Sequence, residues 1–177
     1  MSYPLAEHGV HMRRPEPRDI PAILRFKNDP EVAAALGGFS TGYSQADGED
    51  WLARRQSRSD ELVHAIATIQ DDTCLGHVGL YQIDHRIRSA EFAIMLGEKS
   101  AWGKGIGGAV TRWMVDFGFA QLNLNRVFLS VLASNQRAHR LYTRIGFVQE
   151  GVLREAQFKN GQYHDVVCMS VLRKEWP

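Results

Sequence analysis

The sequence predicts an α/β (α+β) protein with one mixed, mostly antiparallel central sheet and helices on both faces. Two observations carry this fold class. Apolar residues follow strand patterns over three neighbouring segments within residues 62–96, which is typical of an antiparallel meander. Near the end of the chain, Asn160-Gly161 separates two long strand-like segments, and this dipeptide is the strongest short signal for a β-hairpin.

Helix breakers and a cap divide the first half of the chain. Pro30 and Gly37-Gly38 break the chain and leave a loop to about residue 43. Ser44 with Asp47 resembles an N-terminal capping box, which starts a further helix. The expected elements are a strand at 10–14, helices at 19–27 and 44–58, and strands at 62–69, 75–83 and 90–96.

Helical spacing is clearest in the second half of the chain. Apolar side chains recur every three or four residues over 109–121 and again over 135–145. Ser134-Asn135 supplies an N-cap for the second of these helices, and Gly146 suits the position just past its end. A strand at 126–131 and hairpin strands at 147–158 and 163–172 complete the expected order.

The composition is that of an ordinary globular protein, and we expect one domain over residues 1–177. The formal net charge is +1, so bulk electrostatics gives no reason to expect a nucleic-acid partner. No apolar run approaches the length of a membrane span and no secretory signal starts the chain, so we expect a cytoplasmic protein without a membrane partner. Cys74 and Cys168 each lie in an apolar segment, which favours two packed thiols over a disulfide.

Residues 102–108 read Trp-Gly-Lys-Gly-Ile-Gly-Gly and precede an expected helix. Glycines leave the backbone without side-chain walls, and a helix that starts directly after them points free N–H groups and its positive dipole end at a ligand. This pattern predicts a site for a phosphate or pyrophosphate, and a tight turn without a ligand is the alternative. A P-loop is excluded because Lys104 is followed by Gly105 and not by Ser or Thr.

Gly103, Gly105 and Gly108 also satisfy the pattern G-x-G-x-x-G, so a nicotinamide-dinucleotide protein is a competing interpretation. That fingerprint needs a parallel βαβ unit and an acidic residue about 20 positions further on. Residues 122–126 contain no acid, and a meander precedes the loop. Both observations disfavour a dinucleotide site.

Several short motifs in the second half of the chain belong together. They are residues 90–92 (Ala-Glu-Phe), 102–108, 134–142 (Ser-Asn-Gln-Arg-Ala-His-Arg-Leu-Tyr), 146–148, 150–151 and 160–165. With these motifs the chain resembles the GCN5-related N-acetyltransferases, the GNAT superfamily. It is similar to the branch of ribosomal-protein N-terminal acetyltransferases and spermidine N-acetyltransferases. The family's pyrophosphate motif, Gln/Arg-x-x-Gly-x-Gly/Ala, falls on residues 102–107, where Trp102 replaces the usual Gln or Arg.

The resemblance implies the GNAT fold and the transfer of an acetyl group from acetyl-CoA to a primary amine, by direct attack in a ternary complex. The expected acceptor is a protein N-terminus, a polyamine or another small amine. No metal is expected, because the histidines and cysteines show no ligand spacing. The implied cofactor-binding residues are Ile94, Met95, Leu96, Trp102, Gly103, Lys104, Gly105, Ile106, Gly107, Gly108 and Asn135.

Glu91 is the residue that we expect to accept the proton of the acceptor amine, directly or through water. An amine with a pKa of about 10.4 is almost fully protonated at pH 7, so a base accelerates its attack. Strand alternation places Glu91 on the face of Ala93 and Met95. The alternative is an ordinary strand glutamate, either solvated or paired with Arg86 or Arg88.

Tyr142 is the expected general acid, on the strength of the resemblance. A phenol within reach of the departing sulfur can protonate the thiolate. By pattern alone, Tyr142 belongs to the apolar face of its helix and would only pack there. Asn135 matches the asparagine that holds the cofactor arm in the family, and it also suits a plain N-cap.

The acceptor side is the least defined part of the site. Residues 163–165 (Tyr-His-Asp) match a motif of this branch and either shape the acceptor pocket or pair across strands. Asp47, Glu49 and Asp50 either attract a cation or form a solvated helix face. A non-catalytic acyl-CoA-binding module is a further alternative to an enzyme, and pairing of sheet edges across a two-fold axis would give a homodimer.

Overall fold

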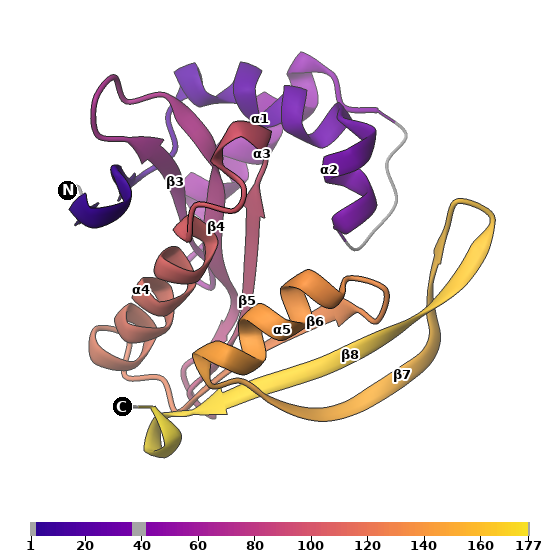
Figure 1. Cartoon of the computed structure of the whole chain (residues 1–177). Helices are drawn as coiled ribbons and strands as arrows, with labels where there is room; N and C mark the ends of the chain where they lie inside the picture. Colours follow the sequence, from indigo (N-terminus) through magenta and orange to yellow (C-terminus); the bar gives the residue numbers. More distant parts are fainter. Residues whose placement is uncertain (1–2, 37–41, 177) are drawn as a thin grey trace.

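A computed structural model describes residues 3–36 and 42–176, which form a mixed sheet with helices on both faces (Figure 1). Over these residues the sheet has eight strands in the order β1-β2-β3-β4-β5-β6-β8-β7, and every neighbouring pair except β5–β6 is antiparallel. The predicted fold class is confirmed. The strands are β1 (Tyr3–Leu5), β2 (Val10–Arg13), β3 (Leu62–Thr68), β4 (Cys74–Asp84), β5 (Ser89–Leu96), β6 (Arg126–Leu132), β7 (Val148–Lys159) and β8 (Gln162–Leu172).

Two groups of helices cover the two faces of the sheet. One group packs Val110 and Met114 against the strands, in a core that also contains Leu80. The other group buries Ile23 and Trp51 in a second core. The first group is α4 (Ile106–Ala120) and α5 (Gln136–Ile145), and the second is α1 (Ile20–Asn28), α2 (Pro30–Ala35) and α3 (Gln45–Ser57).

The parallel pair β5–β6 is short, and this gives the sheet its functional shape. Only Ser89, Ala90 and Glu91 of β5 pair with β6, whereas β5 stays paired with β4 as far as Leu96. Beyond Glu91 the two strands therefore separate, and the C-terminal end of β5 is left without a neighbour on that side. In Figure 1, β3, β4 and β5 run up the picture while β6, β8 and β7 turn away to the right.

Local signals placed several boundaries correctly. The Ser44 hydroxyl oxygen accepts a hydrogen bond from the Asp47 N–H, and the Asp47 carboxylate accepts one from the Ser44 N–H, so the capping box is confirmed. Gly146 ends α5 with φ +122°. Asn160 and Gly161 both have positive φ (51° and 75°), as a two-residue hairpin of type I′ requires.

The structure corrects three expectations. Pro30 does not break the chain but begins α2, because Asp29 caps this helix by accepting from the N–H groups of the next turn and proline suits a first helical position. Helix α4 begins at Ile106 rather than at residue 109, so Gly107 and Gly108 lie in its first turn. Strand β1 was not predicted. The expected loop at Gly37-Gly38 lies outside the described residues.

Two simpler expectations concern the thiols and the membrane. Cys74 and Cys168 are free thiols, as predicted. Within residues 3–36 and 42–176, no helix has both the length and the apolar character needed to cross a bilayer. The single domain over residues 1–177 stays a prediction.

Candidate functional site

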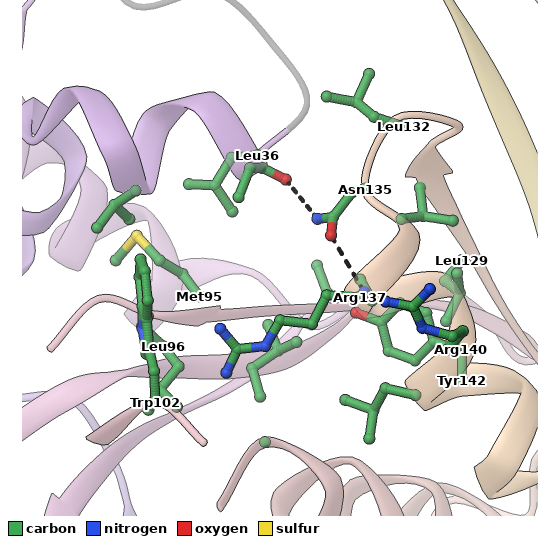
Figure 2. Close-up of a pocket in the computed structure, with 18 of the residues that line it drawn as sticks. Leu36, Met95, Leu96, Trp102, Leu129, Leu132, Asn135, Arg137, Arg140 and Tyr142 are labelled. Carbon is green, nitrogen blue, oxygen red and sulfur yellow. Dashed lines mark hydrogen bonds between the residues drawn. The ribbon is translucent and has the colours of Figure 1, made fainter. Parts of the chain in front are cut away.

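The separation of β5 from β6 opens a cavity of about 880 Å³ between the two helix layers. One end is formed by the glycine run and the first turn of α4. The other end is formed by α2 and the faces of β5, β6 and β8 (Figure 2). The lining residues from β5 run from Glu91 to Leu96, so the unpaired edge of this strand faces the cavity.

The glycine run is built to receive an anion. Gly103 and Gly105 have φ +78° and +80°, a conformation that other residues rarely adopt. The first backbone bond of α4 joins the Ala109 N–H to the Gly105 carbonyl at 3.1 Å. Within the described part of the chain, the preceding N–H groups of Ile106, Gly107 and Gly108 have no partner, and all three residues line the cavity. These donors and the positive end of the α4 dipole suit a phosphate group.

Gly108 packs closely against α5. A Cβ at this position would lie 3.3 Å from Cδ1 of Leu141, which also lines the cavity. A side chain here would be in tight contact with Leu141. The cradle thus fits a pyrophosphate, which needs a close approach to the backbone.

Trp102 occupies the position where the family motif has Gln or Arg. Its indole Nε1 donates to the Leu96 carbonyl at 2.7 Å, and the Arg137 guanidinium lies 5.6 Å from the centre of one of its rings. Trp102 therefore connects the glycine run to the end of β5 by a hydrogen bond, and its ring makes a cation–π contact with a guanidinium group of α5. At this point of the site the positive charge comes from Arg137 and not from residue 102.

Three arginines of α5 line the cavity and were missed by sequence reasoning. Arg137, Arg140 and Arg144 are spaced by three and four residues, so they share one side of the helix. That spacing was visible in the sequence, but the apolar positions of the same helix dominated the interpretation. The three residues give the cavity wall on α5 a positive charge, and Arg137 brings part of it beside the glycine run.

Asn135 is the N-cap of α5, and its amide also crosses to α2. The side-chain oxygen accepts from the Ala138 N–H at 3.1 Å, and Nδ2 donates to the Ala35 carbonyl at 3.1 Å (Figure 2). Lys159 lies near the tip of the β7–β8 hairpin, and its ammonium group donates hydrogen bonds to the carbonyls of Ala33 and Leu36. The C-terminal end of α2 is therefore held from two directions beside the cavity.

Tyr142 is buried and lines the cavity. Its ring packs against Phe92 and Phe147, with centroids 6.1 and 5.8 Å away. Burial raises the pKa of Tyr142 to about 12. Among the described residues its hydroxyl has no hydrogen-bond partner, so at neutral pH it is a protonated donor free for a ligand.

Glu91 lies at the last paired position between β5 and β6, opposite Phe128. Its carboxylate accepts from Nε2 of Gln82 at 2.9 Å. Neither Arg86 nor Arg88 forms an ion pair with it in the described part of the chain. Glu91 is thus a partly buried carboxylate at the cavity wall with a neutral partner.

Most of the expected site residues come together around this one cavity. The structure places there Glu91, Ile94, Met95, Leu96, Trp102, Gly103, Gly105, Ile106, Gly107, Gly108, Asn135 and Tyr142. Lys104 is the exception: it is exposed and does not line the cavity, because the positive φ of Gly103 and Gly105 on either side turns the chain there. Across residues 3–36 and 42–176, no group of His, Cys, Asp or Glu side chains could hold a metal ion.

The branch motif at the hairpin lies outside the cavity lining. Tyr163 stacks on Phe158 across the strands with centroids 5.0 Å apart, and Asp165 accepts from the Glu155 N–H at 2.8 Å. The structure therefore shows cross-strand contacts for Tyr163 and Asp165. At the acceptor end, sequence reasoning missed Val32, Leu36, Ala93, Ser130 and Gln157.

Comparisons with known proteins agree with this geometry. The family description "Acetyltransferase (GNAT) domain" matches residues 10–148. The chain is 38% identical to the spermidine N(1)-acetyltransferase of Vibrio cholerae, over 93% of this chain and 94% of that protein. It is 34% identical to YdaF of Bacillus subtilis, which is named as a candidate ribosomal N-acetyltransferase, over 96% and 94% of the two chains. The crystal structure of the Vibrio cholerae spermidine N-acetyltransferase with CoA and spermine superposes with a TM-score of 0.87 at 29% identity, covering 94% of this chain and 97% of that one.

Proposed function

Since this chain belongs to the GNAT acetyltransferase family, we propose that it acetylates the N-terminal amine of a polypeptide. The chain is an N-acetyltransferase that uses acetyl-CoA. The choice of acceptor is the part that goes beyond the family. It rests on the distribution of carboxylates around the acceptor end of the cavity.

The residues present fit acetyl-CoA. The free N–H groups of Ile106, Gly107 and Gly108 would hold the pyrophosphate, and the α5 arginines would neutralise the phosphates. Residues 94–96 of β5 have no strand partner on the side of β6, so their backbone groups are available to the pantetheine arm. When bound, acetyl-CoA supplies the activated acetyl thioester.

Two side chains of the cavity supply the proton transfers in this proposal. Glu91 accepts a proton from the acceptor ammonium, directly or through a water. Tyr142 offers its hydroxyl proton to the sulfur as the thiolate departs; its raised pKa keeps that proton in place beforehand. An α-amino group has a pKa of about 7.7 to 8.0, so roughly one molecule in ten is already neutral at pH 7 and a single carboxylate is an adequate base.

The acceptor end of the cavity carries little negative charge. Among the described lining residues the only carboxylates are those of Glu31 and Glu91. Glu31 is neutralised by Lys99, whose Nζ lies 2.8 Å from its carboxylate. The acids of α3 are not in the lining, and Asp47 is used by the capping box. One carboxylate without a cationic partner suits one ammonium group rather than the several cations of a polyamine.

Apolar side chains make up much of the cavity wall. Val32 of α2, Leu36 just after it, and Ala93 and Met95 of β5 all line the cavity. These side chains can pack against a small apolar first residue of a peptide. Spermidine is the second candidate acceptor, supported by the relatives that are named for it.

A direct competition between acceptors tests the proposal. CoA release is measured with an N-terminal Ala or Ser peptide, with the same peptide acetylated at its N-terminus but carrying a free lysine, and with spermidine. We expect kcat/KM for the free N-terminus to exceed that for spermidine by at least about tenfold. This ratio corresponds to about 1.4 kcal/mol, close to the lower range for one buried ion pair. A higher kcat/KM for spermidine, or equal use of the lysine peptide, would reject the N-terminal acceptor.

We also propose that the chain forms a homodimer. Strand β7 is the edge of the sheet, and Val148, Val152 and Leu153 on this strand are exposed. An edge with exposed apolar side chains and open backbone groups favours pairing with a second copy. Sedimentation equilibrium should give the dimer mass, and Val152→Lys should give the monomer mass; a monomeric wild-type chain would contradict the proposal.

A further inference from the structure

The strands around Glu91 contain a positioning residue that belongs to none of the motifs. We propose that Gln82 holds the Glu91 carboxylate in its reacting orientation, an inference that rests on the proton-accepting role proposed for Glu91. Gln82 Nε2 donates to Glu91 Oε2 at 2.9 Å. Because this donor fixes one carboxylate oxygen, the other oxygen is left for the acceptor amine or for a water.

A β-bulge brings the Gln82 side chain to this face of the sheet. Two residues of β4, Gln82 and Ile83, lie opposite the single residue Ala90 of β5. Regular alternation after the buried Leu80 would turn Gln82 into the core. With the extra residue, Ile83 takes the core position and Gln82 reaches Glu91 on the opposite face. Bulges beside active sites commonly redirect a side chain in this way.

The backbone at Gln82 is held in an unfavourable conformation. Its φ is +49°, in the left-handed region that residues other than Gly, Asn and Asp seldom adopt. Such strain persists only where surrounding structure imposes it, and it gathers at functional sites. Here the imposed conformation coincides with the hydrogen bond to the carboxylate that lines the cavity.

Among residues 3–36 and 42–176, no side chain other than Gln82 donates a hydrogen bond to Glu91. Tyr81 lies directly opposite Glu91, but its ring covers Gly79, where a Cβ would lie 2.9 Å from two ring atoms. The Tyr81 ring also faces the Arg55 guanidinium at 5.3 Å, and within the described ranges Tyr81 makes no hydrogen bond to Glu91. Arg88 donates instead to a backbone oxygen after α4. A neutral amide leaves the carboxylate free to attract the acceptor ammonium, whereas a guanidinium would compete with it.

The variant Gln82→Gly separates this role from folding. Glycine accepts a positive φ, so the variant should unfold no more easily than the wild type while it lacks the amide. We expect kcat with the N-terminal peptide to fall by about tenfold, as for the loss of a hydrogen bond to a charged group, with KM for acetyl-CoA unchanged within about twofold. Gln82→Asn, which keeps a shorter amide, should recover part of kcat. Asn123→Gly is the matched control, because it relieves φ +52° at an exposed turn after α4 and should leave kcat unchanged.

A double variant decides whether Gln82 acts through Glu91. We expect Glu91→Gln to lower kcat and Gln82→Gly to cause no further loss in that background, since the group it positions is gone. Two outcomes would overturn the positioning role alone. One is a double variant whose loss in kcat equals the product of the two single losses. The other is a wild-type kcat for Gln82→Gly while Glu91→Gln is impaired. A wild-type kcat for Glu91→Gln would overturn the base role itself, and the positioning role with it.

Discussion

The guanidinium of Arg137 lies over an indole ring of Trp102, 5.6 Å from its centre, where α5 meets the glycine run (Figure 2). The same indole donates to the Leu96 carbonyl at 2.7 Å. One side chain therefore joins the end of β5, the loop before α4 and the first turn of α5. A Gln or Arg at this position would offer its own polar group to a pyrophosphate, whereas Trp102 orients the cation of a neighbour.

Loss of the Trp102 side chain should weaken acetyl-CoA binding. Trp102→Ala removes a hydrogen bond and a cation–π contact, which are worth about 1 kcal/mol each, so we expect the dissociation constant for CoA to rise by about tenfold or more. Calorimetric titration with CoA measures this without turnover. Trp102→Phe keeps an aromatic ring under Arg137, so it should lose only the part of the CoA binding free energy that comes from the hydrogen bond.

The coupling between the two residues can be measured separately. In a double-mutant cycle of Trp102→Ala and Arg137→Gln, we expect an interaction energy of about 0.5 to 1 kcal/mol, typical of a partly exposed cation–π pair. Additive effects of the two substitutions would mean that Trp102 does not position Arg137 for the ligand.

Removal of the Tyr142 hydroxyl should affect chemistry and not folding. The hydroxyl has no hydrogen-bond partner among the described residues, so Tyr142→Phe should leave the melting temperature nearly unchanged. General acid catalysis contributes about 10²-fold or more, and we expect kcat to fall by that order. Tyr163→Phe, at the exposed hairpin tip, is the control for loss of a phenol. A Tyr142→Phe variant with wild-type kcat would show that packing is the whole role of this ring.

Features coded by neighbouring residues could be predicted from the sequence. The hairpin at Asn160-Gly161 and the capping box at Ser44 depend on backbone conformations that those residues themselves favour. The anion cradle could be predicted for the same reason, because its glycines and the helix start are contiguous. Helix α2 was missed although Pro30 favours a first helical position, since a proline also ends helices and the sequence does not choose between the two.

Features that depend on register or on distant segments could not be predicted. Gln82 reaches Glu91 only because two residues of β4 face one residue of β5, and this bulge is set by the pairing of whole strands. The amide of Asn135 meets a carbonyl 100 residues earlier in the chain. The three cavity arginines left a visible spacing, but only the fold decides which side of α5 faces the cavity.

Lys159 should control the acceptor end of the cavity rather than the cofactor end. Its ammonium caps the carbonyls of Ala33 and Leu36 at the end of α2, and burial lowers the pKa of this group. Lys159→Met keeps the aliphatic stem but leaves those carbonyls uncapped, so we expect KM for the acceptor to rise several-fold, or about 1 kcal/mol. The dissociation constant for CoA should stay unchanged. Lys174→Met, at an exposed position, is the control, and equal changes in both constants would contradict this assignment.

Buried His64 should make the fold sensitive to acid. Its ring lies among Tyr3, Trp113 and Phe117, at 5.7, 5.3 and 6.3 Å, and burial lowers its pKa to about 4 from the ordinary 6.5. Between these values the unfolded chain binds a proton that the folded chain does not, so the free energy of unfolding decreases as pH falls from 6.5 to 4. At about 1.4 kcal/mol per pKa unit, the loss is on the order of 3 kcal/mol. Urea unfolding between pH 7 and pH 4.5 should show a smaller loss of unfolding free energy in His64→Phe than in the wild type. His85→Phe, at an exposed position, is the control and should match the wild type. The same pH dependence of the unfolding free energy in all three proteins would show that His64 is protonated in the folded state.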